Sequence, residues 1–493
     1  MNRRLRSVFK HIVLATGYGL LGAIVFAAIG YIYFLETRPD LKIWHTARLD
    51  AEFTAERSND VNTLAGYLEI EERVMQQLQQ KVYDRIGAED RRQIVRYHRG
   101  SMMDPDSRPA NWNRTFELTP DRPAAGALLI HGLSDSPYSM RAIAESLYSH
   151  NVLSIGMRMP GHGTAPSGLV DVHWKDFVAA VRIGANELKS RLGDAPLFIV
   201  GYSNGAALAV EYALAPLEGS MSPQADALVL LSPAIGVSPV AALARWQGRL
   251  GKIAGFKKLA WNSIEPEFDP YKYNSFAVNA GDQIHQLTSA IERRINNLAA
   301  AHGLIYFPRT IAFQSVVDAT VPPQALLDRF FMKLDKSGGH QLVLFDVNRY
   351  SETEPLLRSD PDSFVKSLFE DPGLPFDLSL VTNVETTTED VMVRFKLAQS
   401  PFVFDRPLMR AWPAEMFSMS HVAVPFPPDD PLYGGSHVPG DERVTLGSVH
   451  IKGERNLLQI PDGFFMRLRH NPFFDYMMKR IVEFLELESP DTS

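Results

Sequence analysis

Cysteine is absent from this chain of 493 residues. Its absence excludes structural disulfides, thiolate zinc sites, iron–sulfur clusters and a cysteine nucleophile. Basic residues do not predominate either, because 50 lysines and arginines face 57 aspartates and glutamates, for a net charge of -7. We therefore do not expect a basic surface that binds nucleic acid. The chain also lacks an H-E-x-x-H and a G-x-x-x-x-G-K-[ST] sequence, which argues against a zincin site and a nucleotide-hydrolysing P-loop.

One long uncharged run lies near the N-terminus, at residues 12–34, and Arg3, Arg4, Arg6 and Lys10 precede it. As a helix, this run is long enough to cross a hydrocarbon layer of ~30 Å. Positive charge before the span predicts a cytoplasmic N-terminus, with the rest of the chain outside, in the periplasm if the source is bacterial. A cleaved signal peptide is the alternative. However, the apolar core of a signal peptide is only ~7–15 residues long, and no clear A-x-A site follows this run.

Changes in pattern along the chain predict its domain organisation. We expect a cytoplasmic N-terminus (1–11), a transmembrane anchor (12–34), a helical stalk or extension (35–113), a first part of the core (114–235), a cap (236–304), a second part of the core (305–350), an insertion (351–413) and a C-terminal part (414–493). The cap and the insertion are each longer than a normal connection between elements. The helix predicted in the stalk could be a spacer or could pack on the main domain.

Short apolar runs alternate with helical stretches from residue 114 onward. Strands are expected at residues 127–130, 152–157, 197–200, 227–231, 311–317 and 342–347. Helices are expected at residues 140–150, 174–192, 205–215 and 473–487. This alternation is typical of a mostly parallel sheet that helices cover on both faces.

A candidate nucleophile lies in the sequence Gly201-Tyr202-Ser203-Asn204-Gly205. An apolar run precedes this G-x-S-x-G and a helical run follows it, which is the strand–turn–helix context of a nucleophile elbow. The alternative is a glycine-rich helix start that a serine caps. Because a serine hydroxyl is a weak nucleophile, it needs a base, and the base needs an acid that orients it.

Four segments resemble the α/β-hydrolase superfamily, and within it the group of monoacylglycerol lipases, carboxylesterases and serine aminopeptidases. They are residues 129–133 (LIHGL), 158–163 (RMPGHG), 201–205 (GYSNG) and 317–322 (VDATVP). The resemblance implies an α/β-hydrolase fold, with a mostly parallel sheet and a helical cap insertion, which the transmembrane helix predicted above would precede. It also implies a triad in the order Ser, Asp or Glu, His, which requires no cofactor and no metal.

The resemblance suggests the partners of Ser203. Asp318 ends the apolar run 311–317 and matches the acid at a strand end, with Asp346 as the reserve candidate. Five histidines follow Asp318, and His421 is the preferred base, with His437 as the second candidate. Here the sequence departs from the family pattern, because the usual histidine comes soon after the last strand and His421 comes much later.

Two backbone N–H groups should form an oxyanion hole, which stabilises the negative oxygen of a tetrahedral intermediate. By the same resemblance they belong to Leu133 and Asn204. Asn204 replaces the bulkier residue that is common in the family, but the donor is a backbone group and should be unaffected. His131 and His162 are expected to support loops rather than to act in the chemistry.

These features predict a membrane-anchored serine hydrolase of carboxylic esters, similar to lipases, lysophospholipases or carboxylesterases. Its partners would be an ester or lipid-like substrate and the membrane. An amidase or peptidase, an acyltransferase, and a non-catalytic module that kept the fold stay open. In the cap, aromatic residues could line an acyl pocket or could simply pack on the core. The basic run at residues 245–258 could lie against anionic lipid or be a solvated helix face.

Overall fold

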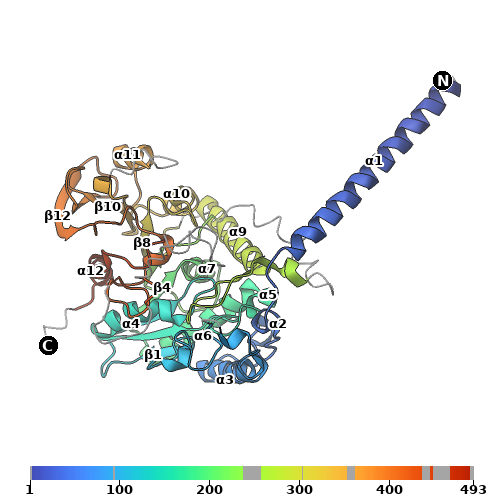
Figure 1. Ribbon diagram of the computed structural model, residues 1–493. Coiled ribbons are helices and arrows are strands. Elements are labelled where there is room, and N and C mark those ends of the chain that lie inside the picture. The colour runs from blue at the N-terminus through green and yellow to red at the C-terminus, as the bar shows by residue number, and fades with distance from the viewer. Residues whose placement is uncertain are drawn as a thin grey trace.

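The computed structural model describes residues 3–92, 95–236, 257–301, 304–351, 361–435, 445–447 and 467–488. Helix α1 (Arg3–Glu36) extends away from the body of the molecule (Figure 1). Its segment Lys10–Phe34 is long and apolar enough to cross a membrane, and none of it is buried against the rest of the chain. A signal sequence would meet the same criteria.

Among the described residues, one sheet contains ten strands in the order β1-β3-β2-β4-β5-β8-β9-β10-β11-β12. Their bounds are β1 Phe116–Leu118, β2 Ala125–Ile130, β3 Val152–Met157, β4 Leu197–Tyr202, β5 Ala227–Leu231, β8 Arg309–Ser315, β9 Gln341–Phe345, β10 Asp377–Asn383, β11 Asp390–Lys396 and β12 Val403–Ala411. Neighbouring strands from β3 to β10 are parallel, whereas β1, β11 and β12 pair antiparallel with their neighbours. The expected mostly parallel sheet is confirmed.

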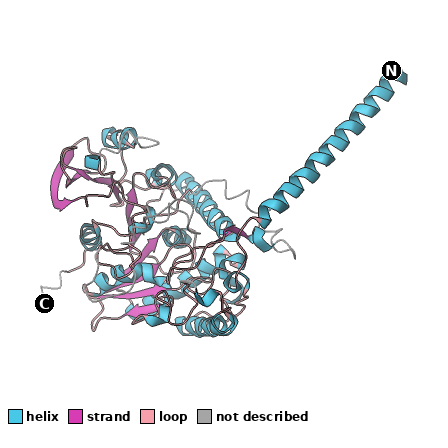
Figure 2. Cartoon of the chain, in the orientation of Figure 1, coloured by secondary structure: helices cyan, strands magenta, loops and turns pink. Residues whose placement is uncertain are grey.

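Helices cover both faces of this sheet, and Figure 2 shows the strands passing between them. On strand β2, Leu128 and Ile130 pack in one apolar cluster, whereas Ala127 and Leu129 pack in the other. Successive side chains on a strand point to opposite faces, so both faces of β2 are buried. The first cluster includes residues of α6 (Trp174–Leu192), α7 (Asn204–Leu217) and α9 (Val278–Ala301), and the second includes residues of α4 (Arg141–Tyr148) and α12 (Phe474–Leu485).

The predicted stalk packs on the core instead of standing apart from it. Helix α3 (Leu64–Lys81) begins after Thr63, whose side chain accepts a hydrogen bond from the Gly66 N–H. Tyr67, Ile70 and Val74 of α3 are buried in the same cluster as α6. The sequence left open whether this helix is a spacer or packs on the main domain, and in the structure it packs on the main domain. The short helix α2 (Ile43–Thr46) precedes it.

The segment predicted as an insertion, residues 351–413, extends the central sheet. Its described part contains α11 (Asp362–Glu370) and the strands β10, β11 and β12. Lys396, with 1% of its surface exposed, donates to the carbonyl oxygens of Phe369 (2.8 Å), Leu368 (3.5 Å) and Asp371. A lysine at this place satisfies the last carbonyl groups of α11 and ties β11 to it.

Four further elements complete the α-helices and β-strands of the described residues. They are α5 (Gly168–Asp171), α10 (Pro323–Arg329), and the strands β6 (Trp261–Ser263) and β7 (Phe276–Ala277), which form a separate antiparallel pair. The strands β6 and β7 and helix α9 lie in the predicted cap, whose residues 237–256 lie outside the described residues.

His340, directly before β9, gives the fold a predicted pH dependence. It is 1% exposed, and neither ring nitrogen has a hydrogen-bond partner within the described residues. Burial lowers the pKa of His340 to about 4, although Asp335 opposes this shift. An unfolded histidine has a pKa of about 6.5, so below that pH the unfolded chain binds a proton that the folded chain does not. Stability should therefore fall as the pH drops from 6.5 towards 4, by at most about 1.4 kcal/mol per pH unit for this residue.

The variant His340→Leu removes this titrating group and leaves no unpaired polar atom in its place. We expect the free energy of unfolding to depend less steeply on pH between 6.5 and 4, with no loss of stability at pH 8. Denaturant titrations at a series of pH values measure both quantities. Equal slopes for the variant and the wild type would contradict the assignment.

Candidate active site

Ser203 stands on a strained turn between β4 and α7. Its φ angle is 54°, in the left-handed region that residues other than glycine rarely adopt. A Cβ on Gly205 would lie 2.0 Å from the Ile130 carbonyl oxygen, and a Cβ on Gly201 would lie 2.4 Å from the Gly205 carbonyl oxygen. Glycine is therefore required on both sides of the turn. The Ser203 side chain makes no capping hydrogen bond, so the alternative of a helix start capped by this serine is not what the structure shows.

Three side chains that are far apart in the sequence meet at this turn. The Nε2 atom of His421 lies 2.9 Å from Ser203 Oγ, and its Nδ1 atom lies 2.7 Å from Asp318 Oδ2. All three residues are largely buried. The other oxygen of the Asp318 carboxylate accepts hydrogen bonds from the backbone N–H groups of Thr320 (2.8 Å) and Val321 (2.9 Å). The arrangement can pass a proton from a serine hydroxyl to an imidazole that a carboxylate orients.

The structure explains the long segment between β9 and His421. Strands β10 to β12 are inserted between β9 and His421, and they widen the sheet on its far side. The chain then returns to the site, where Val347 pairs with Ser418 in an isolated bridge and Asn348 Nδ2 donates to the Met416 carbonyl oxygen (2.9 Å). These contacts hold the segment before His421 beside the end of β9.

The reserve candidates have other surroundings. Asp346 pairs with Arg349 (2.8 Å) and accepts a hydrogen bond from the Thr382 hydroxyl (2.7 Å), within a buried cluster that does not include Ser203. His437 lies outside the described residues. His340 precedes β9 and so lies at the opposite edge of the sheet from Ser203.

The two predicted oxyanion donors follow the carboxyl ends of two neighbouring parallel strands, β4 and β2. Asn204 is the first residue of α7, and Leu133 follows the end of β2. Within the described part of the chain, neither backbone N–H donates to a protein acceptor. The Asn204 N–H also lies in the field of a helix N-terminus, which favours negative charge.

His131 and His162 are buried and neutral supports. His131 Nε2 accepts a hydrogen bond from the Met159 N–H (3.0 Å), and His162 Nδ1 lies 2.9 Å from the Pro160 carbonyl oxygen. Burial lowers the pKa of His131 well below its ordinary value, and burial lowers the pKa of His162 to about 4. Neither ring contacts Ser203 in the hydrogen-bond network.

Two contributions to the site were not predicted. Gln314 Nε2 donates to Asp318 Oδ2 (3.0 Å) and to the Val321 carbonyl oxygen (2.9 Å), which fixes the acid and the turn that follows it. A glutamine within the otherwise apolar strand β8 is the sequence signal that could have revealed this role. The second contribution is a pair of carboxylates, Glu52 and Glu71, which bind Arg158, the residue before Met159, whose N–H donates to His131.

The aromatic residues of the cap mostly pack against the body. Tyr271 stacks on Tyr138 with ring centroids 4.2 Å apart, and the Tyr273 hydroxyl accepts from the Thr164 N–H (2.7 Å). Trp261 is 1% exposed. Trp246 and most of the basic run at residues 245–258 lie outside the described residues. Ile284 of α9 joins Ala234, Val321 and Leu133 in a small apolar cluster, and the Ala234 N–H donates to the Ser203 carbonyl oxygen (3.1 Å).

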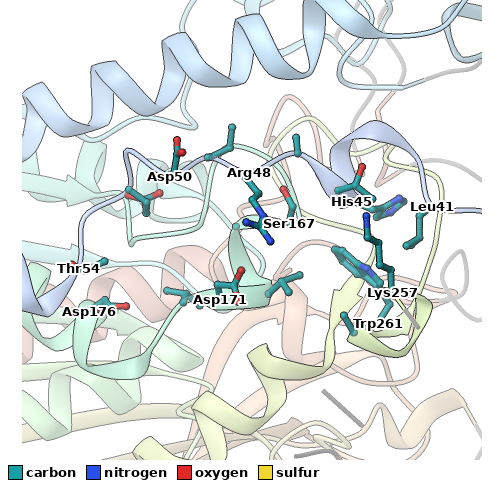
Figure 3. A pocket seen from close by; sticks show the side chains of 18 of the residues that line it. Leu41, His45, Arg48, Asp50, Thr54, Ser167, Asp171, Asp176, Lys257 and Trp261 are labelled. Atoms are coloured by element: carbon teal, nitrogen blue, oxygen red, sulfur yellow. The ribbon is translucent and has the colours of Figure 1, made fainter. Parts of the chain in front are cut away.

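A cavity of about 530 Å³ lies elsewhere, between the N-terminal extension, α5 and β6 (Figure 3). Its labelled lining includes His45, Arg48, Asp171, Lys257 and Trp261. Ser203, Asp318 and His421 do not line it. In the part of the chain that the structure describes, no group of three histidine, aspartate or glutamate side chains could hold a metal ion.

The chain has recognisable relatives. Residues 121–320 match the family model of the serine aminopeptidases, S33. A thermostable monoacylglycerol lipase of Bacillus sp. (strain H-257) is 30% identical over 117 residues, which are 24% of this chain and 44% of that relative. The chain thus matches less than half the length of this curated relative.

Two solved structures are similar as well. The monoacylglycerol lipase of Paleococcus ferrophilus is 18% identical, and the match covers 47% of this chain and 88% of that one with a TM-score of 0.35. A structure reported for the metagenome-derived lipolytic enzymes LipS and LipT is 20% identical, with 48% and 87% covered and a TM-score of 0.36. The family match to residues 121–320 confirms the resemblance to the α/β-hydrolase superfamily, and the sheet described above agrees with that fold.

The close packing at the elbow predicts opposite outcomes for two glycines. Gly205→Ala places its Cβ against backbone oxygen atoms of Ile130 (2.0 Å) and His131 (2.7 Å), which cannot move away without breaking the elbow. We expect this variant to misfold or to lose all reaction of Ser203 with a fluorophosphonate. As a control, Gly281→Ala in α9 places its Cβ 3.5 Å from a Phe276 ring carbon, an ordinary contact.

Because alanine favours helix over glycine by about 1 kcal/mol, Gly281→Ala should keep or raise the thermal stability. Thermal unfolding and fluorophosphonate labelling of the two purified variants measure the contrast. Full labelling of Gly205→Ala at wild-type stability would show that the elbow is not packed as described.

Proposed function

We propose that this chain, whose residues 121–320 match the S33 serine aminopeptidase family, is a membrane-anchored serine hydrolase of carboxylic esters. Its substrates would resemble those of lipases, lysophospholipases or carboxylesterases. The observation that carries the proposal is the position of His421, whose two ring nitrogens lie within hydrogen-bond distance of Ser203 and Asp318. The similarity to a monoacylglycerol lipase favours an ester substrate.

In this proposal Ser203 attacks the ester carbonyl carbon while His421 Nε2 accepts the Oγ proton. Asp318 accepts the Nδ1–H hydrogen bond throughout and stabilises the imidazolium that forms. The N–H groups of Leu133 and Asn204 donate to the oxyanion of the tetrahedral intermediate. His421 then protonates the leaving alkoxide, the C–O bond breaks, and an acyl-enzyme on Ser203 remains. A water molecule, deprotonated by His421, hydrolyses that ester and restores the serine.

Hydrolysis of an amide is the second candidate, because the matching family is named for an aminopeptidase. The same three residues would act, with an amine as the leaving group. A non-catalytic module would not need a histidine held 2.9 Å from Ser203 Oγ or an Asp318 carboxylate fixed by two backbone N–H groups. Parallel assays with an ester and the matching amide distinguish the two chemistries.

The proposed anchor is α1, with its N-terminus in the cytoplasm and the main domain on the other side. The uncovered apolar length of its segment Lys10–Phe34 supports this role. Directly after α1, the Arg38 guanidinium donates to the carbonyl oxygens of Trp261 (2.8 Å) and Asn262 (2.8 Å). Lys258 in turn donates to the Arg38 carbonyl oxygen (2.9 Å). The body would therefore be held close to the membrane surface, where lipid substrates are available.

The function is tested by labelling the detergent-solubilised full chain with a fluorophosphonate probe. We expect labelling of the wild type, none in Ser203→Ala, and a loss of at least about 10³-fold in rate for His421→Ala, because the serine then lacks its base. Hydrolysis of a short-chain p-nitrophenyl ester should fall in parallel. A folded wild type that neither reacts with the probe nor hydrolyses esters would refute the proposal.

The anchor is tested by the mass and the fractionation of the expressed protein. We expect an intact mass of 55.1 kDa and release from membranes by detergent but not by salt or alkaline carbonate. In Ile24→Arg, a charge in the middle of α1 opposes insertion by about 2.5–3.5 kcal/mol, so less protein should reach the membrane fraction. A mature protein that has lost its first residues would instead show that α1 is a cleaved signal sequence.

A further inference from the structure

The peptide group between Gly132 and Leu133 carries one of the proposed oxyanion donors. The carbonyl oxygen of this group belongs to Gly132 and lies 2.8 Å from His131 Nδ1. The described chain contains no cis peptide bond. In a trans peptide group the C=O and the N–H point in opposite directions. The bond to His131 therefore turns the Leu133 N–H away from the imidazole, and it fixes the direction of that donor.

The His131 ring is itself held from behind. Its Nε2 atom accepts a hydrogen bond from the Met159 N–H (3.0 Å), so Nε2 carries no proton and Nδ1 carries the one that is donated to Gly132. Burial lowers the pKa of His131 well below its ordinary value, which keeps the ring neutral and this pattern intact. The position of the Met159 backbone thus determines the orientation of the ring.

Arg158 fixes the backbone at Met159. Its side chain is fully buried and forms a bidentate pair with Glu52, through Nη1 (2.9 Å) and Nη2 (2.8 Å), while its Nε atom lies 3.2 Å from Glu71. Glu52 also accepts a hydrogen bond from the Gly161 N–H (2.9 Å). The two carboxylates therefore hold both the Arg158 side chain and the turn that follows Met159.

The backbone of Arg158 is held in the same way. Its N–H donates to the Thr115 hydroxyl (3.0 Å), which donates to Glu71 (2.7 Å), and its carbonyl oxygen accepts from the Tyr67 hydroxyl (2.6 Å). Burial opposes the ionised form of Glu52, but the Arg158 guanidinium and the backbone N–H groups of Gly161 and Phe53 together hold the pKa of Glu52 below its usual range. Both partners are therefore charged at neutral pH.

Glu52 and Glu71 lie in the N-terminal extension, before residue 121, where the family match begins. The matched region alone contains neither carboxylate that pairs with the Arg158 guanidinium, which is buried in the full chain. A buried charge without its partner is strongly destabilising, because nothing replaces the water that it has lost. The extension therefore supplies the charges that hold the chain at Arg158 and Met159, behind His131.

We propose that Glu52 and Glu71 are positioning residues for the oxyanion hole, which they orient through Arg158, Met159 and His131. This role rests on the proposed ester hydrolysis. It gives the N-terminal extension a part in catalysis besides its position between the anchor and the core.

The test uses the full chain in detergent and the variants Glu52→Gln and Glu71→Gln. Each substitution keeps the shape of the side chain and removes the charge that orients Arg158. The measured quantities are kcat and KM for p-nitrophenyl butyrate, and Ki for an alkyl trifluoromethyl ketone, which forms a tetrahedral adduct on the serine.

Losing one oxyanion donor outright costs about 10²–10³-fold in kcat, and a misdirected donor should cost less. We expect kcat to fall roughly tenfold to a hundredfold in Glu52→Gln, with KM changed by no more than about twofold. Ki for the ketone should rise by the same factor as kcat falls. Glu71→Gln should act in the same direction but less, because Arg158 keeps its bidentate partner.

Lys396→Met is the matched control, because Lys396 is an equally buried charge that binds only the end of α11. We expect it to lose thermal stability and to keep both kcat and Ki. A carboxylate with a merely structural role would lower the fraction of active protein, and so the apparent kcat, but would leave Ki unchanged. An unchanged Ki in Glu52→Gln would therefore overturn the proposal.

Hydrogen exchange of the peptide that covers residues 129–135 gives a readout that does not need activity. It should become faster in Glu52→Gln, or in Glu71→Gln if Glu52→Gln does not fold, and should stay unchanged in Lys396→Met. Equal protection of this peptide in the wild type, the carboxylate variant and Lys396→Met would also overturn the positioning role. If the wild type hydrolyses no ester, the proposed function fails. The hydrogen-exchange comparison still decides whether the two carboxylates position residues 129–135.

Discussion

The backbone contact between Gly205 and the end of β2 is the constraint on which the site depends. The Gly205 Cα lies so close to the carbonyl oxygens of Ile130 and His131 that no side chain fits between them. This contact brings the start of α7 against the end of β2, and it accompanies the strained φ angle of Ser203. Asn204 directly precedes Gly205, and Leu133 follows the end of β2 by three residues, so the contact links the two chain segments that carry the proposed donors. Glycine at position 205 is thus required for the close approach of α7, which follows the proposed nucleophile, to the end of β2.

The core of this fold could be predicted because its signals are local. Strands β2 to β5 are buried on both faces and appear as continuous apolar runs, and the turn at Ser203 is flanked by its glycines. Strands β10 to β12 were not predicted. The burial of β11 is mixed and β12 is mostly exposed, so neither has the apolar run of a central strand. They join the sheet because β10 pairs with β9, β11 with β10 and β12 with β11, and local sequence patterns do not encode such pairing.

The site shows the same division between local and distant information. Ser203 is marked by its neighbours in the sequence, whereas the distance from His421 to Asp318 depends on a bridge between Val347 and Ser418 that has no sequence signature. Glu71 lies on an amphipathic helix, where a carboxylate usually indicates a solvated face. Only the fold reveals that it faces the buried Arg158. A local sequence pattern does not reveal the role of a charged residue whose partner is distant in the chain.

Buried ion pairs contribute little net stability, because desolvation cancels much of their attraction. Apolar side chains of similar volume could fill the space around Arg158 and stabilise the fold at least as well. Such side chains would accept several packings, however, whereas a planar guanidinium with a fixed fork of donors accepts a carboxylate in few orientations. The cluster of Arg158, Glu52 and Glu71 therefore specifies one arrangement of the chain at Met159. Directional bonds then carry that arrangement through His131 to the peptide group that carries the Leu133 N–H. A site whose chemistry depends on the direction of a single N–H needs this kind of support more than it needs additional stability.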